Sequence, residues 1–159
     1  MESKTHHHNH STTLCPEERL DQSLETLKEK GFKLTNKRRE ILEIFIDSDR
    51  YLTAKQVYQS LAEKYPTMSY NTTYRNLYDF VKIGLLESTE YQNEQLFRIS
   101  CEGEDHHHHH FICTNCGKTI PLEICPMDHI QTDLSQVEVQ MHRFEVFGLC
   151  ADCKAKQEA

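Results

Sequence analysis

The chain has 159 residues, enough for one ordinary domain or two small ones with a buried core. Its charged fraction of 27% and hydrophobic fraction of 37% are typical of a soluble protein, and no apolar run approaches the roughly 20 residues that span a bilayer. The polar N-terminus lacks the hydrophobic segment of a signal peptide, so we expect a cytoplasmic protein with no membrane partner.

The net charge of −7 is unevenly distributed along the chain. Residues 28–82 carry 11 Lys and Arg against 7 Asp and Glu, whereas residues 83–159 carry 5 against 13. One segment is therefore basic and the rest is acidic. This asymmetry is compatible with a DNA-binding module joined to a module that holds cations.

Residues 1–15 are expected to form a disordered tail, and four amphipathic helices are predicted after it, each from an apolar stripe between start and stop signals. The start signals are a proline at a first helical position, two N-cap hydroxyls and a capping box: Pro16, Thr35, Ser69 and the pair Thr53 and Gln56. The stop signals are two glycines and a proline: Gly31, Gly84 and Pro66.

After Gly84 the pattern changes period, and two short extended runs around a polar "QNE" turn predict a β-hairpin. Helices followed by such a hairpin indicate a winged helix-turn-helix domain over residues 16–100, with residues 70–83 as the recognition helix. Its polar side chains suit phosphates and base edges, Asn71 and Thr73 among them. An amphipathic core helix that is merely polar outside is the alternative.

Residues 106–159, after a hinge at residues 101–105, are predicted to form a second, β-rich unit. Strands are expected in "HHHHHFIC" and "KTIPLE", a short helix in "PMDHIQTDL", and a strand or strand pair in "VEVQMHRFEVFGLC". The tail "ADCKAKQEA" is expected to add a last helical turn or two. The fold class is thus α+β, an N-terminal winged helix followed by a small α/β domain.

Seven cysteines, an odd number, argue against a disulfide framework and leave thiolates available for metal. Four of them form two Cys-x-x-Cys pairs, each able to bring two sulfurs to one tetrahedral Zn²⁺: Cys113 with Cys116, and Cys150 with Cys153. A redox pair or free thiols are the alternatives. Cys15 and Cys125 lack an obvious partner and are expected to be ordinary residues.

Five consecutive histidines run into the first cysteine pair. On a strand their side chains alternate between faces, so His108 and His110 share one face while His107 and His109 share the other. The histidine run therefore supplies two separate half-sites. The further ligands that each half-site needs are available in Cys101 and Glu87 near the hairpin, and in Asp128 and His142 across the second unit.

Four motifs, in this order, resemble the ferric uptake regulator family of bacterial metal-sensing repressors: "LTNKRREIL", "TTYRNL", "HHHHHFICTNCGK" and "HRFEVFGLCADC". The resemblance covers roughly residues 20–153. It implies a winged helix followed by an α/β dimerisation domain, in a homodimer whose affinity for double-stranded DNA is switched on by a regulatory metal. Within the family the chain is most similar to the zinc-sensing members.

The resemblance implies roles by position. The structural zinc site would be Cys113, Cys116, Cys150 and Cys153, the regulatory hinge site Glu87, Cys101, His108 and His110, and the dimerisation-domain site His107, His109, Asp128 and His142. The DNA contacts would come from the pair Tyr74 and Arg75, with the cluster Lys37, Arg38 and Arg39 on the backbone. Two departures stand out: one extra residue separates Cys101 from the histidine pair, and Pro121 replaces a carboxylate usual in iron and peroxide sensors.

Two imidazoles, one thiolate and one carboxylate suit Zn²⁺ better than iron or manganese, which favour oxygen ligands. We therefore expect structural zinc plus one or two regulatory ions per subunit, in a dimeric repressor that binds palindromic operator DNA and controls zinc-uptake genes. An iron or peroxide sensor, a metal buffer and a zinc enzyme are the alternatives. No His-Glu-x-x-His and no deaminase motif occurs, so neither catalysis nor a small-molecule substrate is expected.

Overall fold

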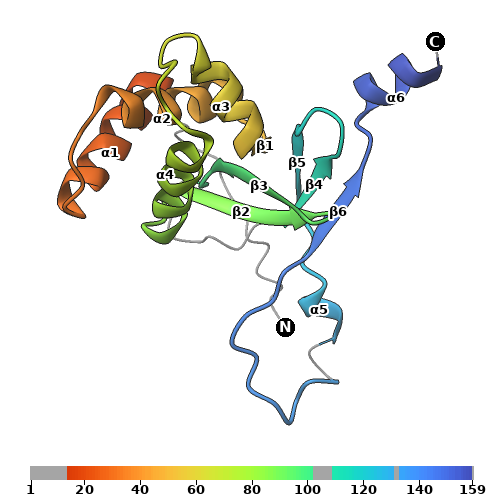
Figure 1. Ribbon diagram of the computed structural model, residues 1–159. Coiled ribbons are helices and arrows are strands. Elements are labelled where there is room, and N and C mark those ends of the chain that lie inside the picture. The colour runs from red at the N-terminus through yellow and green to blue at the C-terminus, as the bar shows by residue number, and fades with distance from the viewer. Residues whose placement is uncertain (1–13, 102–108, 131–132, 159) are drawn as a thin grey trace.

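The computed structural model describes residues 14–101, 109–130 and 133–158, and shows a helical unit with a small sheet beside a second, smaller sheet (Figure 1). Three predicted features lie wholly or mostly outside the described residues: most of the N-terminal tail, the hinge beyond Cys101, and the histidines at positions 106–108. Among the described helices, none has the length and apolar character needed to cross a membrane.

The four predicted helices are confirmed as α1 Pro16–Glu29, α2 Asn36–Ser48, α3 Ala54–Ala62 and α4 Tyr70–Lys82. Their start signals act as expected, because the hydroxyls of Thr35, Thr53 and Ser69 each accept a hydrogen bond from a backbone N–H in the first turn. Helix α3 ends earlier than predicted, since residues 63–64 form a turn before Pro66.

The predicted hairpin is also confirmed, with β2 Leu86–Tyr91 and β3 Glu94–Ile99 paired antiparallel. Gln92 and Asn93 connect them with φ angles of 51° and 65°, the left-handed pair that a two-residue hairpin turn requires. A short strand that the sequence did not predict, β1 Leu52–Thr53, pairs with the other side of β3. Together, α1–α4 and this sheet form the winged helix-turn-helix arrangement.

Apolar residues of all four helices and the sheet form one core in this unit. Its fully buried side chains include Leu27, Ile41, Leu42, Phe45, Val57, Leu77 and Phe80. The core fixes which face of α4 points outward. Thr73 lies on the inner face, at helical spacing from Leu77 and Phe80, and is completely buried.

The second unit contains β4 His109–Cys113, β5 Thr119–Leu122, a short α5 Met127–Ile130, β6 Glu145–Gly148 and α6 Ala151–Glu158. Strand β4 lies in the middle, antiparallel to β5 and parallel to β6. Of the strand or strand pair predicted over residues 137–150, one strand, β6, forms in the second half. Residues 137–144 carry apolar side chains that stay exposed and pair with no strand of the described chain, as Val137 and Met141 illustrate.

The wing packs directly against the second unit. The Thr89 hydroxyl donates to a carboxylate oxygen of Glu145 at 2.6 Å, and Arg143 donates to the Ser88 carbonyl at 3.1 Å. The rings of Tyr91 and Phe147 stack with centroids 4.8 Å apart. Strand β2 therefore provides much of the contact between the two units.

A second junction joins Tyr51, just before β1, to Gly117 in the turn after β4. The Tyr51 N–H donates to the Gly117 carbonyl at 2.9 Å, and Gly117 has a φ of +73°. A Cβ at position 117 would meet the Tyr51 carbonyl oxygen at 2.0 Å. Only glycine lets the two backbones approach this closely.

Replacing Gly117 by alanine should therefore destabilise the protein by about 2 kcal/mol or more, since it adds a backbone clash to left-handed strain. Gly31→Ala is the matched control, because its φ of +80° carries the same strain but nothing lies within 4 Å of the added Cβ. Urea unfolding of both variants measures the difference. Equal decreases in stability would mean that the junction at Tyr51 relaxes freely.

Candidate metal centres and nucleic-acid interface

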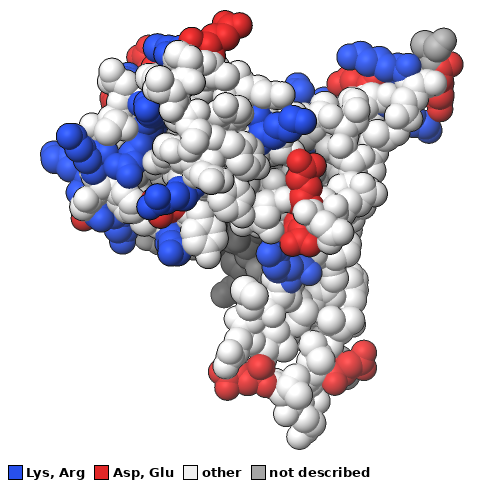
Figure 2. Space-filling model, viewed as in Figure 1, with Lys and Arg blue, Asp and Glu red and all other residues white. Residues whose placement is uncertain are grey.

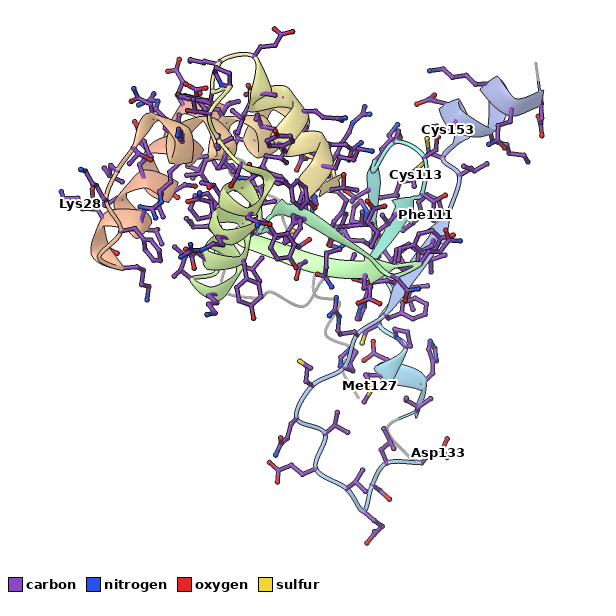
Figure 3. All side chains as sticks on the ribbon, in the orientation of Figure 1. Lys28, Phe111, Cys113, Met127, Asp133 and Cys153 are labelled. Atoms are coloured by element: carbon purple, nitrogen blue, oxygen red, sulfur yellow. The ribbon has the colours of Figure 1, made fainter. Side chains whose placement is uncertain are left out.

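The four paired cysteines come together where β4 ends and α6 begins (Figure 3). Their sulfurs lie within 4.8 Å of one another, and Cys116 Sγ is 3.8 Å from Cys150 Sγ. Four sulfurs at about 2.3 Å from a tetrahedral zinc are separated by about 3.8 Å, so this donor set fits Zn²⁺ with no open coordination position. The structure thus brings together the cysteines that the sequence grouped: Cys113, Cys116, Cys150 and Cys153.

The surroundings of these sulfurs favour an ionised thiol at Cys113. Burial raises the pKa of Cys113, but N–H groups of Cys150 and Cys116 outweigh it and lower that pKa to about 6. The Asn115 amide donates to Cys153 Sγ at 3.2 Å. Burial raises the pKa of Cys116 to about 11. The cysteines also supply the buried residues of a small core that Phe111 and Leu149 complete.

A second cluster contains His109 of β4, His142 before β6 and Cys125 before α5. His142 Nε2 lies 3.3 Å from His109 Nε2 and 3.3 Å from Cys125 Sγ. Two nitrogens bound to one tetrahedral zinc are separated by about 3.3 Å, so this set also fits the ion.

The structure brings together part of the ligand set predicted for this part of the chain. His109 and His142 do meet, but Asp128 is not in the cluster, and His107 lies outside the described residues. Cys125, expected to be an ordinary residue, provides the third donor instead. The available signal was its place in the sequence, three residues before Asp128, because an unpaired thiol near an expected metal site is a candidate ligand.

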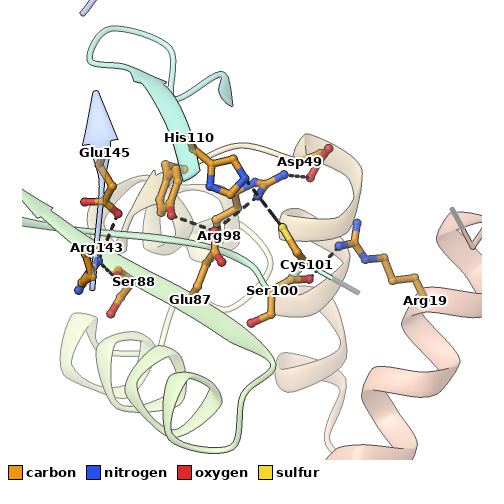
Figure 4. Close-up of polar contacts among 11 residues, drawn as sticks. Arg19, Asp49, Glu87, Ser88, Arg98, Ser100, Cys101, His110, Arg143 and Glu145 are labelled. Atoms are coloured by element: carbon orange, nitrogen blue, oxygen red, sulfur yellow. Dashed lines mark hydrogen bonds and ion pairs between the residues drawn. The ribbon is translucent and has the colours of Figure 1, made fainter. Parts of the chain in front are cut away.

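A third group surrounds Arg98 of β3 and joins both units (Figure 4). Arg98 Nη1 lies 3.4 Å from Cys101 Sγ and 3.5 Å from Glu87 Oε1. Cys101 Sγ is also 4.0 Å from His110 Nε2. Cys101 and His110 thus approach one another, and Arg98 links Cys101 to Glu87, but the three donor atoms do not all lie within 4.8 Å of one another. The fourth predicted regulatory ligand, His108, lies outside the described residues. Adjacent His109 and His110 belong to different clusters, as alternation along β4 predicts.

Arg98 and His110 are buried within this group, whereas Asp49 and part of Glu87 are exposed. Burial raises the pKa of the Cys101 thiol, although Arg98 partly opposes this. Burial lowers the pKa of Arg98, but the charges of Cys101 and Asp49 outweigh it and the net shift is upward. Burial also raises the pKa of Tyr51, whose hydroxyl donates to Glu87 Oε1 at 2.9 Å. Sequence reasoning missed both Arg98 and Tyr51, since neither residue type is a usual zinc ligand.

The candidate nucleic-acid interface is the outer face of α4 and the start of α2. Asn71, Tyr74 and Arg75 are exposed there. Thr73 was a wrong prediction, because its side chain is fully buried and cannot reach DNA. Exposed Tyr70 and Tyr78 flank Tyr74 at helical spacing and were not predicted, although the i, i+4 pattern was visible in the sequence.

The basic residues at the start of α2 have different partners. Arg38 is half-buried and donates to the Asn76 side chain at 3.0 Å, so it holds α2 against α4. Arg39 pairs with Glu43, while Lys37 lies over the Tyr65 ring. Figure 2 shows Lys and Arg side chains gathered over the helical unit, whereas the lower part of the second unit is mostly uncharged and carries acidic side chains at its edges.

Comparison with known proteins identifies relatives of this arrangement. The family model described as the ferric uptake regulator family matches residues 29–147. A "ferric uptake regulation protein" of Staphylococcus epidermidis is 44% identical over 134 residues, which cover 84% of this chain and 95% of the relative. Its counterpart in Staphylococcus aureus is 43% identical over 132 residues, covering 83% and 96%.

Solved structures share the fold. The ferric uptake regulator of Helicobacter pylori, described with three functional metal-binding sites, has a TM-score of 0.66 at 23% identity and covers 89% of this chain and 95% of its own. A zinc uptake regulator complexed with zinc and DNA has a TM-score of 0.67 at 24% identity, covering 92% and 99%. With the family match over most of its length, its α+β fold and its Cys₄ cluster, this chain belongs to the ferric uptake regulator family of metal-responsive transcriptional regulators.

Proposed function

We propose that this chain is a zinc-responsive, dimeric repressor that binds palindromic operator DNA when regulatory zinc is bound and so controls zinc-uptake genes. The observation that carries the choice of metal is sulfur in both clusters outside the Cys₄ site. Cys101 lies beside His110, and Cys125 lies beside His142. Thiolate with imidazole suits Zn²⁺, whereas iron and manganese sites favour oxygen donors.

The Cys101 cluster suits a regulatory role because its members come from both units. Glu87 and Cys101 lie on or just after the wing strands, and His110 lies on β4. A bound Zn²⁺ would supply a crosslink between these donors. Cys101 and Glu87 would then hold the wing against the second unit, together with the contacts of Thr89 and Arg143. The angle of the winged helix, and hence the presentation of α4, would be fixed.

Exposed apolar side chains support a homodimer. Most of the exposed large hydrophobic residues of the described chain lie in the second unit, and the core of that unit is small. A surface of this kind is costly in a monomer and is typical of an interface between copies. The exposed residues are Ile120, Ile124, Ile130, Val137, Val139, Met141, Phe144 and Val146. Two copies related by a two-fold axis would present two α4 helices to a palindromic site.

A titration of DNA binding against buffered free metal tests the proposal. DNA sequences would first be selected from a random pool by the zinc-loaded protein. Binding of the selected duplex would then be measured with Zn²⁺, Fe²⁺ and Mn²⁺, with metal counted per subunit. We expect Zn²⁺ to switch on binding at the lowest free concentration, with at least one ion beyond the structural one. Equal or better activation by Fe²⁺ would overturn the choice of zinc.

An iron-responsive regulator is the second candidate, and the names of the relatives favour it. Staphylococcal proteins more than 40% identical to this chain are called ferric uptake regulation proteins. The same titration separates the two candidates. An iron sensor should bind DNA when free Fe²⁺ is raised, and should not bind DNA when free Zn²⁺ is raised over its own buffered range. The thiols of Cys101 and Cys125 argue against it on ligand chemistry.

Replacing Cys101 by serine should raise the free zinc needed for DNA binding by about tenfold to a hundredfold, since a sulfur ligand is exchanged for a poorer oxygen donor. Cys15→Ser is the matched control, because Cys15 is exposed at the start of α1, far along the chain from the predicted ligands. The measurement is the zinc titration of DNA affinity. An unchanged zinc dependence in the Cys101 variant would remove Cys101 from the regulatory site.

A further inference from the structure

The buried guanidinium of Arg98 lies among the predicted regulatory ligands, and the side chain is only 9% exposed. It contacts the Cys101 sulfur and the Glu87 carboxylate through Nη1, and the Asp49 carboxylate through Nη2 at 3.1 Å. A cation is therefore already in contact with the two donors of this group that carry negative charge when they bind metal. Figure 4 shows Arg98 between Cys101, Glu87 and Asp49, with His110 adjacent.

Arg98 and a divalent ion cannot both make these contacts at full strength. A metal ion held by Cys101, Glu87 and His110 would lie within a few ångströms of the guanidinium, and their charges repel most strongly where water is excluded. The same Nη1 contacts both Cys101 Sγ and Glu87 Oε1, so it occupies the space between these two donors. A metal ion bound by both donors would take this space, so its binding requires Nη1 to move away from them.

Asp49 provides Arg98 with a partner that does not compete for metal. It is the C-cap residue of α2, with a φ of 43°, and more than half of its side chain is exposed. Arg98 can keep its contact with Asp49 when Nη1 leaves Glu87 and Cys101. Buried charge is strongly destabilising when it is left unpaired, so this remaining partner makes the exchange possible.

We propose that Arg98 is an internal cation that competes with the regulatory metal for Glu87 and Cys101, and so sets the free-metal concentration at which the sensor responds. This inference rests on the proposed function, because it takes the Cys101 group as the regulatory site. Arg98 is a tuning residue that binds no metal itself. It lowers the affinity of the site, and its remaining contact to Asp49 determines by how much.

The test measures zinc affinity directly, by competition with a chromophoric chelator, in full-length protein carrying His142→Ala so that the other histidine cluster does not contribute. Arg98→Gln removes the charge and keeps a hydrogen-bonding amide. We expect this variant to bind the second zinc at least tenfold more tightly than its parent, while the Cys₄ zinc is unchanged. Equal or weaker binding, in protein that unfolds cooperatively near the parental temperature, overturns the proposal.

Arg39→Gln is the matched control for charge alone. The Arg39 side chain is about half exposed on α2 and pairs with Glu43 at 2.9 Å. Glu43 lies outside the predicted regulatory ligand set, so removing this guanidinium should leave zinc affinity within about twofold. An equal gain in zinc affinity in the Arg39 and Arg98 variants would mean that the general charge of the protein, and not direct competition for the donors, sets that affinity.

A double-mutant cycle with Asp49→Asn tests the mechanism. Asparagine tolerates the left-handed backbone of position 49, so the fold should be retained. Alone, Asp49→Asn should weaken zinc binding severalfold, since Arg98 is then held more firmly by Glu87 and Cys101. In the Arg98→Gln background it should have little effect. Equal effects in both backgrounds would show that Asp49 acts on the metal independently of Arg98.

Two remaining outcomes also decide the matter. If Arg98→Gln proves too unstable to measure, Arg98→Lys replaces it. A single ammonium cannot hold all three partners, so we expect a severalfold gain in zinc affinity. Equal or weaker zinc binding by this variant overturns the proposal. If the parent takes up only the Cys₄ zinc, the proposed function fails. A second zinc that then appears in the Arg98 variant would still support competition.

Discussion

Cys150→Ser should remove the structural zinc and unfold the second unit while the helical unit stays folded. The Cys150 sulfur is buried 3.8 Å from that of Cys116, and the cysteines are themselves most of the second core. Structural zinc sites contribute about 10 kcal/mol or more of folding free energy in small domains. A serine oxygen cannot replace the thiolate, so most of this contribution should disappear.

The measurements for this variant are zinc content per chain and hydrogen exchange by peptide. Peptides covering β4, β6 and α6 should exchange rapidly, whereas those covering α2 and α4 should stay protected, because the core of the helical unit contains none of the four cysteines. Cys15→Ser should match the parent in both measurements. Retention of the zinc and protection of β4 in Cys150→Ser would contradict the assigned ligand set.

Arg75→Ala should weaken binding to selected operator DNA by about a hundredfold, since it removes an exposed guanidinium from α4, the predicted recognition helix, in both subunits of the proposed dimer. Removing one side chain that reads a base costs about 1–3 kcal/mol in each half-site. The decrease should be smaller on unrelated DNA, because base contacts specify and phosphate contacts do not. Fluorescence anisotropy with both duplexes measures it.

Thr73→Val is the matched control on the same helix. The Thr73 side chain is fully buried, and its hydroxyl has no hydrogen-bond partner among the described residues. Valine has nearly the same shape without the buried polar group, so stability should be equal or about 1 kcal/mol higher, with unchanged DNA affinity. A clear decrease in DNA affinity in this variant would place Thr73 at the interface and contradict the packing of α4.

Local signals predicted the helical unit well. Thr35, Thr53 and Ser69 each cap a helix in the structure, and Gly84 follows α4 with a φ of +82°. These features are local, because each depends on residues within one helical turn. Strand β1 was missed for the opposite reason, since its two residues form a strand only through pairing with β3.

The metal centres were only partly predictable. Spacing alone indicated the Cys₄ site, and strand alternation separated His109 from His110. The contact of Cys125 with His142 depends on how two loops meet across the second unit, and no local pattern encodes it. Thr73 was assigned to the wrong face because a hydroxyl on a helix is polar in the sequence even where the fold buries it.

Strand β4 carries one residue of each of the three candidate donor groups within five positions: His109, His110 and Cys113. A shift of β4 by one residue relative to β6 would exchange the two histidines between clusters and turn Cys113 away from the other sulfurs. Any insertion or deletion between positions 109 and 113 would therefore disrupt three donor sets at once. Length variation in this part of the molecule should be confined to the segment before His109 and to the turn between Cys116 and β5.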